Sequence, residues 1–250
     1  MIAIKRLHNY LGKQLFGAKE TAPETAYNLW AKNYDDQPDN LMLALDEEVF
    51  SVLLNQLEPK NKIVIDIGCG TGRHWKKIIE TQPKKITGFD VSEKMLAMLQ
   101  QKFPHAETYH LVDDTLKTVA DNSCDIIIST LTIAHIKNAE QALKEWVRVL
   151  KPDGDIIITD YHPAALAKGG DRTFKYQNKI VAIINHVHPV NRILDIGNRL
   201  NLKVLQLIEK NIDDSVKHYY EKNNALAVFE KWKNTPIIYG VRLKKPDAIK

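Results

Sequence analysis

The sequence has few cysteines and no long apolar run. Its 250 residues include only Cys69 and Cys124, which do not form the C-x-x-C pair typical of zinc sites. No stretch approaches about 18 consecutive apolar residues, so the sequence predicts no membrane-spanning helix. The segment Met1–Gly17 lacks the basic-then-apolar layout of a secretory signal. We therefore expect a cytoplasmic protein that has no metal site.

The sequence also lacks internal repeats, low-complexity tracts and linkers rich in proline, glycine or serine, which predicts a single domain over residues 1–250. The formal net charge is only +4. Four cations, Lys5, Arg6, Lys13 and Lys19, stand near the N-terminus, so the remainder is close to neutral. The body of the protein therefore lacks the basic face that a nucleic-acid-binding protein needs.

The basic N-terminal arm has apolar residues at helical spacing, namely Ile4, Leu7, Leu11 and Leu15. An amphipathic helix of this kind can contact an anionic membrane or a partner protein. It can equally pack on its own domain, which is the commoner use of such a pattern. The sequence leaves both alternatives open.

From Lys62 onward, apolar runs alternate with amphipathic segments. The predicted strands are Ile63–Ile65, Lys85–Phe89, Thr108–Val112, Asp125–Ser129 and Asp155–Asp160. The predicted helices are Lys76–Glu80, a segment capped by Ser92 that contains Met95, Leu96, Leu99 and Phe103, and Ala139–Leu150, which the turn Lys151–Gly154 ends. Strands that alternate with helices in this way predict βαβ units and a parallel sheet.

This alternation breaks after Tyr161. Two β-like runs, Arg172–Tyr176 and Lys179–Ile184, meet at Gln177-Asn178 and predict a hairpin. The remaining expected elements are a helix over Pro189–Leu200, a strand over Leu202–Ile208, a helical stretch over 214–233 and a strand over Ile237–Leu243. The prediction is an α/β sandwich of about seven strands with a hairpin inserted after the fifth.

The most specific motif is a glycine loop. Gly68, Gly70 and Gly72 follow the first predicted strand, and Asp66 precedes them. A dinucleotide-binding loop would need glycine where Arg73 stands, and a P-loop would need a lysine after Gly72. The loop suits a cofactor that has no pyrophosphate but has a cationic amino-acid end. Asp66 can support that end directly or through water.

Asp90 ends the second predicted strand, 18 residues beyond Gly72. A carboxylate there can accept hydrogen bonds from both hydroxyls of a ribose. A lone acid at a strand end is often only a turn residue or a cap. Its position after this glycine loop favours the ribose ligand.

These motifs resemble those of the class I S-adenosylmethionine-dependent methyltransferases, and most of all the small-molecule branch of ubiquinone/menaquinone C-methyltransferases and malonyl-carrier methyltransferases. The resemblance covers about residues 27–161 and the strand-helix-strand finish. It implies a Rossmann-like seven-stranded sheet of order 3-2-1-4-5-7-6 and S-adenosyl-L-methionine as cofactor. It also implies the cofactor-binding residues Asp66, Gly68, Cys69, Gly70, Gly72, Asp90, Val91, Met95, Asp113, Asp114, Thr130 and Leu131. In the segment Arg148–Asp155, Asp153 replaces the first glycine of the family pattern R-x-L-K-P-G-G.

Methyl transfer needs an aligned acceptor, exclusion of water and, for a poor nucleophile, removal of a proton. The candidate catalytic residues are His162, His135 and Tyr161, and the candidate substrate-pocket residues are Tyr27, Trp30, Tyr34, His186 and His188. Each has a plainer alternative: Trp30 can belong to the core and His135 can cap a helix. His186 and His188 resemble a metal pair, but no third ligand is evident.

The expected reaction is methyl transfer to an O, N or C atom of a small molecule. Ser129–Thr132 replaces the D/N-P-P-Y/F run of enzymes that methylate bases or glutamine. One alternative is a regulatory or partner protein that binds the cofactor without turnover, and a nicotinamide oxidoreductase is a more distant one. Within the domain we expect an N-terminal arm and lid (1–60), a cofactor-binding core (61–161), a substrate-side insert (162–188) and a C-terminal completion (189–250).

Overall fold

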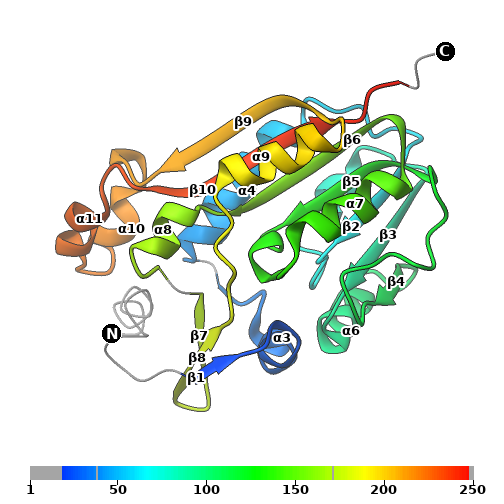
Figure 1. The fold of residues 1–250 in the computed structure, drawn as a ribbon. Helices are drawn as coiled ribbons and strands as arrows, with labels where there is room; N and C mark the ends of the chain where they lie inside the picture. The colour runs from blue at the N-terminus through cyan, green and yellow to red at the C-terminus, as the bar shows by residue number, and fades with distance from the viewer. Residues whose placement is uncertain (1–18, 38, 171, 248–250) are drawn as a thin grey trace.

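The computed structural model describes residues 19–37, 39–170 and 172–247. A seven-stranded sheet of order β4-β3-β2-β5-β6-β10-β9 forms its centre (Figure 1). The strands are β2 (Ile63–Ile67), β3 (Lys85–Asp90), β4 (Glu107–His110), β5 (Cys124–Thr130), β6 (Leu150–Tyr161), β9 (Lys203–Asn211) and β10 (Pro236–Lys244). β10 is antiparallel to both neighbours and the other pairings are parallel, so the strand order predicted from the family resemblance is confirmed.

Helices cover both faces of this sheet (Figure 1). On one face α4 (Leu41–Leu54), α5 (Trp75–Glu80) and α6 (Glu93–Lys102) pack into one hydrophobic cluster. On the other face α7 (Ala139–Val149) and α9 (Val190–Arg199) pack into a second cluster. Ser92 caps α6 as predicted, because its Oγ accepts a hydrogen bond from the Met95 N–H.

The fourth predicted strand shows why the sequence is so apolar there. Ile126 and Ile128 of β5 pack into the first cluster, whereas Ile127 packs into the second. All three are at most 4% exposed. A parallel strand with helices on both faces needs apolar residues at every position, and this one has them.

β6 departs from the prediction. It begins at Leu150, which pairs with Cys124, so the predicted turn Lys151–Gly154 is part of the strand. An irregularity in the pairing and a left-handed backbone at Asp153, with φ of 59°, take the place of that turn. Because glycine adopts this conformation most easily, the position explains the glycine of the family pattern.

The C-terminal part follows the prediction except over residues 214–233. That stretch forms a 3-10 turn and two short helices, α10 (Lys217–Glu221) and α11 (Leu226–Trp232), where one helical stretch was expected. The chain leaves helical geometry at Asn224, where φ is 50°. β9 extends three residues beyond the predicted Ile208 and α9 lies within the predicted range.

A second, three-stranded sheet of order β1-β8-β7 contains the predicted hairpin. β7 (Thr173–Tyr176) and β8 (Lys179–Ile183) are antiparallel, and positive φ at both Gln177 and Asn178 gives the tight turn that their strand twist favours. β1 (Lys19–Thr21) pairs with β8 in parallel, which the sequence did not predict.

The helix α3 (Pro23–Trp30) packs on this small sheet through Ala26, Phe174 and Ile183. We call β1, α3 and the hairpin over residues 172–183 the roof, because they lie together beside the end of the main sheet, next to α6 (Figure 1). The basic arm predicted before residue 19 lies outside the described residues. Over the described ranges, no helix has the length and hydropathy needed to cross a bilayer.

Candidate active site

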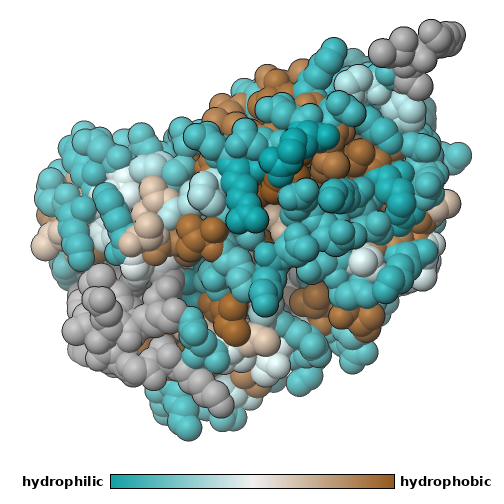
Figure 2. Space-filling view, in the orientation of Figure 1, coloured by the Kyte–Doolittle hydropathy of each residue, from teal (hydrophilic) through white to brown (hydrophobic). Residues whose placement is uncertain are grey.

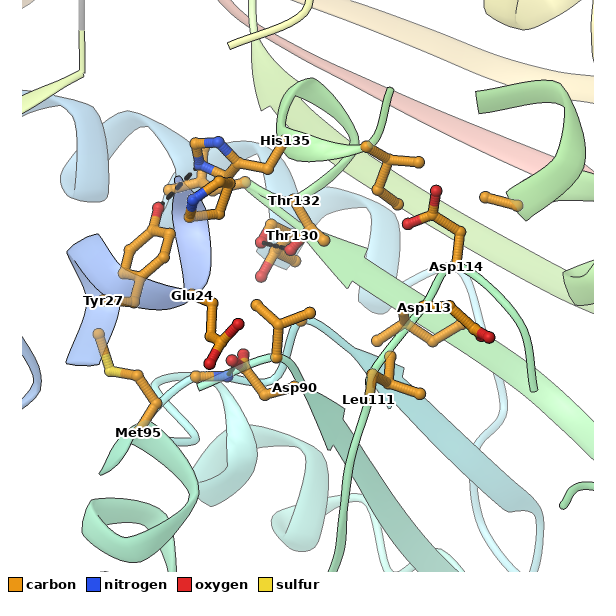
Figure 3. Close-up of a pocket in the computed structure, with 18 of the residues that line it drawn as sticks. Glu24, Tyr27, Asp90, Met95, Leu111, Asp113, Asp114, Thr130, Thr132 and His135 are labelled. Carbon is orange, nitrogen blue, oxygen red and sulfur yellow. Dashed lines mark hydrogen bonds between the residues drawn. The ribbon is translucent and has the colours of Figure 1, made fainter. Parts of the chain in front are cut away.

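A cavity of about 270 Å³ lies between the roof and the carboxyl ends of β2, β3 and β5 (Figure 3). Parallel α/β sheets bind ligands at this edge because the loops after the strands converge there. Residues of the cavity wall come from the roof, the glycine loop and the loops after β3, β4 and β5. Among the predicted site residues, the wall includes Tyr27, Tyr34, Gly68, Gly70, Asp90, Val91, Met95, Asp113, Asp114, Thr130, Leu131 and His135.

The glycine loop follows β2 and has positive φ at Gly68, Gly70 and Gly72. A Cβ on Gly68 would lie 2.0 Å from Thr132 Oγ1, so the close approach of these two loops requires glycine. A Cβ on Gly70 would meet nothing within 4 Å, because this residue borders the cavity. Gly72 instead packs against Leu99 of α6 and is not part of the wall.

Asp90 forms the cavity wall at the end of β3. Its Oδ2 accepts a hydrogen bond from the Gly70 N–H at 2.8 Å, and its Oδ1 accepts one from the Ser92 N–H at 2.8 Å. Burial raises the pKa of Asp90 to about 6, although these two N–H groups oppose the rise. Each oxygen keeps further acceptor capacity, so the carboxylate can accept hydrogen bonds from a bound ligand.

Asp66 lies behind the glycine loop and is not part of the cavity wall. Its Oδ2 accepts a hydrogen bond from Trp75 Nε1 at 2.8 Å, while its buried Oδ1 has no hydrogen-bond partner. Burial raises the pKa of Asp66 to about 6 as well, and the Trp75 hydrogen bond opposes the rise. Cys69, like Gly72, is a predicted loop residue away from the wall, and it is buried.

The end of the cavity beside β4 is an apolar slot that carries carboxylates at its rim. Leu111 supplies apolar surface beside Asp113 and Asp114, which follow β4, whereas Met95 lies on the side of Tyr27 (Figure 3). Asp113 Oδ1 accepts a hydrogen bond from the Thr115 N–H at 2.9 Å, and its Oδ2 accepts one from Lys117 Nζ at 2.8 Å. This end suits a flat, partly polar group such as a nucleobase.

The opposite end, under the roof, carries a tyrosine and a histidine in contact. Tyr27 Oη lies 2.9 Å from His135 Nε2, and His135 Nδ1 lies 3.0 Å from the Ile184 carbonyl oxygen (Figure 3). A carbonyl can only accept, so Nδ1 carries the hydrogen and Nε2 is an acceptor for the Tyr27 hydroxyl. Burial and the nearby Arg172 charge lower the pKa of His135 well below its usual value, so the ring is neutral.

Besides Asp66, Cys69 and Gly72, five more predicted residues lie outside this cavity. Trp30 stacks on Phe174 at 4.6 Å within the roof, which is the core position that the sequence left open for it. His162 caps the short helix α8 (Pro163–Ala167) and its Nε2 lies 2.8 Å from Glu209 Oε1. The others, Tyr161, His186 and His188, border a separate recess of about 10 Å³.

Sequence reasoning missed several residues of this region, three of which have a charged or hydroxyl side chain. Glu24 and Thr132 belong to the cavity wall, and Arg172 reaches the wall from the roof to contact His135 at 2.7 Å. Thr132 stood within the motif after β5 and could have been included. Glu24 and Arg172 had no local signal, because only the folding of the roof over the sheet edge brings them there.

Comparisons with known proteins agree with this architecture. Residues 65–158, from β2 to β6, match the methyltransferase domain family. The chain is 28% identical over 161 residues to the malonyl-(acyl-carrier protein) O-methyltransferase of Marinomonas sp. (strain MWYL1). That match covers 63% of this chain and 56% of the relative, so the chain spans little more than half the length of this curated relative.

Solved structures show the same fold. A putative S-adenosylmethionine-dependent methyltransferase from Listeria monocytogenes superposes with a TM-score of 0.63 at 19% identity, covering 82% of this chain and 100% of that chain. The cyclase SpnF superposes with a TM-score of 0.65 at 14% identity, covering 92% of this chain and 100% of that chain. Because the second of these is described as a cyclase, the fold by itself does not fix the reaction. The strand order and these superpositions show that this chain has the Rossmann-like methyltransferase fold, and its residues 65–158 are similar to the methyltransferase domain family.

Proposed function

We propose that the protein is an enzyme that transfers the methyl group of S-adenosyl-L-methionine to an O, N or C atom of a small-molecule acceptor. The observation that carries the proposal is the pairing of Asp90 with Gly70 at the cavity wall, where a carboxylate and an open backbone position face the same space. We also propose a cytoplasmic location, since both cysteines are free and buried.

The residues present fit this cofactor. Asp90 can accept hydrogen bonds from the ribose hydroxyls, and Val91 and Leu111 can flank the adenine. Gly70 leaves room for the methionine part, and the charge of the Asp66 carboxylate behind the glycine loop can stabilise its ammonium end. The bound cofactor supplies a methyl group already activated by a sulfonium. The chain has to bind it, orient the acceptor and exclude water.

Tyr27 and His135 can orient the acceptor. The Tyr27 hydroxyl donates to His135 Nε2, so an oxygen lone pair of Tyr27 remains for an O–H or N–H of the acceptor. That hydrogen bond would align the acceptor atom with the methyl group that the bound cofactor would supply. The roof residues above the cavity keep water away during the transfer.

Binding of S-adenosylhomocysteine to the full chain, measured by calorimetry, tests the cofactor part of the proposal. Transfer of labelled methyl groups into a metabolite extract tests the reaction. Binding without transfer to any acceptor would favour a regulatory or partner role over an enzyme. If neither S-adenosylhomocysteine nor S-adenosyl-L-methionine binds, the proposal is refuted.

Replacing Asp90 with alanine should weaken S-adenosylhomocysteine binding by about 1–3 kcal/mol, because hydrogen bonds to a charged group are lost. The matched control is Asp214→Ala, which removes an exposed carboxylate paired with Lys233 at 2.8 Å far along the chain. Calorimetry should show unchanged affinity for the control. Equal affinities for Asp90→Ala and the wild type would rule out Asp90 as the ribose ligand.

Cofactor affinity should also fall as the pH is lowered through about 6. The pKa of Asp90 is raised to about 6 by burial, so acidification protonates the acceptor of the ribose hydrogen bonds. The dissociation constant should rise by at most about tenfold per pH unit below that point. The dependence should weaken in Asp90→Asn. An unchanged pH dependence in that variant would mean that another group titrates. Asp66 would be the first candidate, because burial raises its pKa to about 6 as well.

Tyr27→Phe should lower kcat by about 10- to 1000-fold once an acceptor has been identified, with little change in cofactor affinity. His135→Gln should lower it by a similar factor, and the double variant should lose little more, because His135 acts only by holding the Tyr27 hydroxyl. His162→Gln is the comparison variant, since His162 was predicted to be catalytic but lies outside the cavity. A larger loss of kcat in His162→Gln than in Tyr27→Phe would reverse this assignment.

A further inference from the structure

The side chain of Arg172 runs from the roof to the ends of two strands of the main sheet. Its Nη1 donates to the Leu131 carbonyl at 2.6 Å and lies 2.7 Å from His135 Nε2. Its Nη2 donates to Asp160 Oδ1 in an ion pair whose side chains are 10% and 0% exposed. One guanidinium therefore connects the inserted hairpin to the loop after β5 and to β6.

Each of these partners is unusual in its own right. Leu131 has a φ of 52°, a left-handed conformation that is rare for leucine and needs support from surrounding contacts. Asp160 is fully buried and also accepts hydrogen bonds from the Ala134 N–H at 2.8 Å and the Tyr161 N–H at 2.6 Å. Its negative charge balances Arg172, so the guanidinium can stay buried.

We propose that Arg172 is a positioning residue that fixes the His135 ring and the Leu131 backbone so that the Tyr27 hydroxyl faces the methyl acceptor. This inference rests on the proposed function and deepens it, because it assigns a task to the insert. Arg172 belongs to the roof and His135 to the sheet edge, so their contact forms only when the roof is seated. Exclusion of water and alignment of the Tyr27 hydroxyl therefore occur together.

The hydrogen bonds around His135 support this role. With Nδ1 donating to the Ile184 carbonyl, Nε2 has no hydrogen, and the Arg172 and Tyr27 donors share its single lone pair. A guanidinium always carries its charge, so it disfavours a second proton on this ring. Burial is the larger cause of the lowered pKa of His135, and Arg172 is the next.

The other titratable groups around His135 do not offset that effect. His186 lies on the loop that packs against η3 (Ile133–His135), and its charge would also oppose protonation of the ring. The hydroxyl of Tyr27 is protonated, because burial raises its pKa. The carboxylate of Asp160 forms an ion pair with Arg172, so its charge does not offset that effect either.

A buried ion pair can also be purely structural, so the test needs a readout that stability alone does not change. We suggest ¹⁵N NMR of the full chain labelled at histidine, with the His135 signals assigned by their loss in His135→Gln. In the wild type, the signals should report one neutral tautomer with hydrogen on Nδ1 throughout the pH range in which an exposed histidine becomes protonated. The variant Arg172→Met should show mixed tautomers and protonation at higher pH.

Arg199→Met is the matched control, because Arg199 is 58% exposed on α9 and pairs only at the surface with Glu140. Its His135 signals should equal those of the wild type. If Arg172→Met does not fold, Arg172→Lys gives the same test, since a lysine can keep the charge beside Asp160 but cannot span Leu131 and His135 as well. Unchanged His135 signals in a folded Arg172 variant would overturn the inference.

The same samples separate this inference from the proposed function. S-adenosylhomocysteine should bind Arg172→Lys within about threefold of the wild type, because the ribose and glycine-loop contacts are elsewhere. Once an acceptor is known, kcat should fall more than KM changes. Wild-type protein that binds no cofactor would refute the proposed function even if the His135 signals respond as expected. Cofactor binding together with unresponsive His135 signals would refute only the role of Arg172.

Discussion

Replacing Asp46 with alanine should lower the free energy of unfolding by about 3–5 kcal/mol, the cost of leaving a buried charge without its partner. Asp46 is completely buried in α4 and contacts three side chains. Arg73 Nη2 and Thr159 Oγ1 donate to its two oxygens, and His74 Nε2 lies 3.1 Å away. Removal of the carboxylate would leave these groups without this partner. It would also remove the hydrogen bonds that join α4 to the glycine loop and to β6.

Thermal unfolding followed by circular dichroism measures this effect, which should lower Tm by about 10 °C in a domain of this size. Glu48→Ala is the control on the same helix, because Glu48 is half exposed and pairs with Lys210 at the surface. It should cost less than about 1 kcal/mol. Equal effects of the two substitutions would mean that the buried network contributes no special stability.

The pH dependence of the Asp46 effect follows from the direction of its pKa shift. Burial would raise the pKa of Asp46, but the charge of Arg73 and the His74 hydrogen bond outweigh it and hold the pKa well below the usual range. Stabilisation by a carboxylate with a lowered pKa is present above its unfolded value and disappears as the pH falls. The stability difference between wild type and Asp46→Ala should therefore shrink below about pH 4.

The parts of the fold that the sequence predicts well are those fixed by local pattern. Ile126–Ile128 identified a strand buried on both faces, and Gln177-Asn178 identified the hairpin turn, where both residues have positive φ. The sheet order came from the family resemblance and could not be obtained from periodicity, because the same strands fit several orders. The strand β1 was missed because three residues carry no usable pattern and its partner β8 is far along the chain.

The candidate site also has residues that the sequence predicts and residues that it does not. The glycine loop and Asp90 are close in sequence and were identified together, and the structure places both at the cavity wall. His162 was chosen because it follows a strand end, yet its ring is turned away to cap α8 and contact Glu209. Arg172 was not chosen, because its role depends on how the hairpin folds back over the sheet, and an isolated arginine gives no indication of that.

Gly70→Ala should reduce the affinity for S-adenosylhomocysteine by about 100-fold or more, equivalent to about 2.8 kcal/mol. The added Cβ would meet no protein atom within 4 Å, so it would project into space that the proposed ligand occupies. The backbone at Gly70 has a φ of 54°, which costs a non-glycine residue about 1–2 kcal/mol of stability in any case. The loss of affinity therefore has to be separated from this loss of stability.

Gly169→Ala provides that separation. Gly169 also has a positive φ, of 88°, and a Cβ there would also meet nothing within 4 Å, but the residue is not part of the cavity wall. Both substitutions should therefore lower Tm by similar amounts, whereas only Gly70→Ala should change the calorimetric dissociation constant. A Gly70→Ala protein that binds the ligand as tightly as Gly169→Ala does would show that the open space beside Gly70 is not the cofactor site, and Asp90 would then have no ribose to hold.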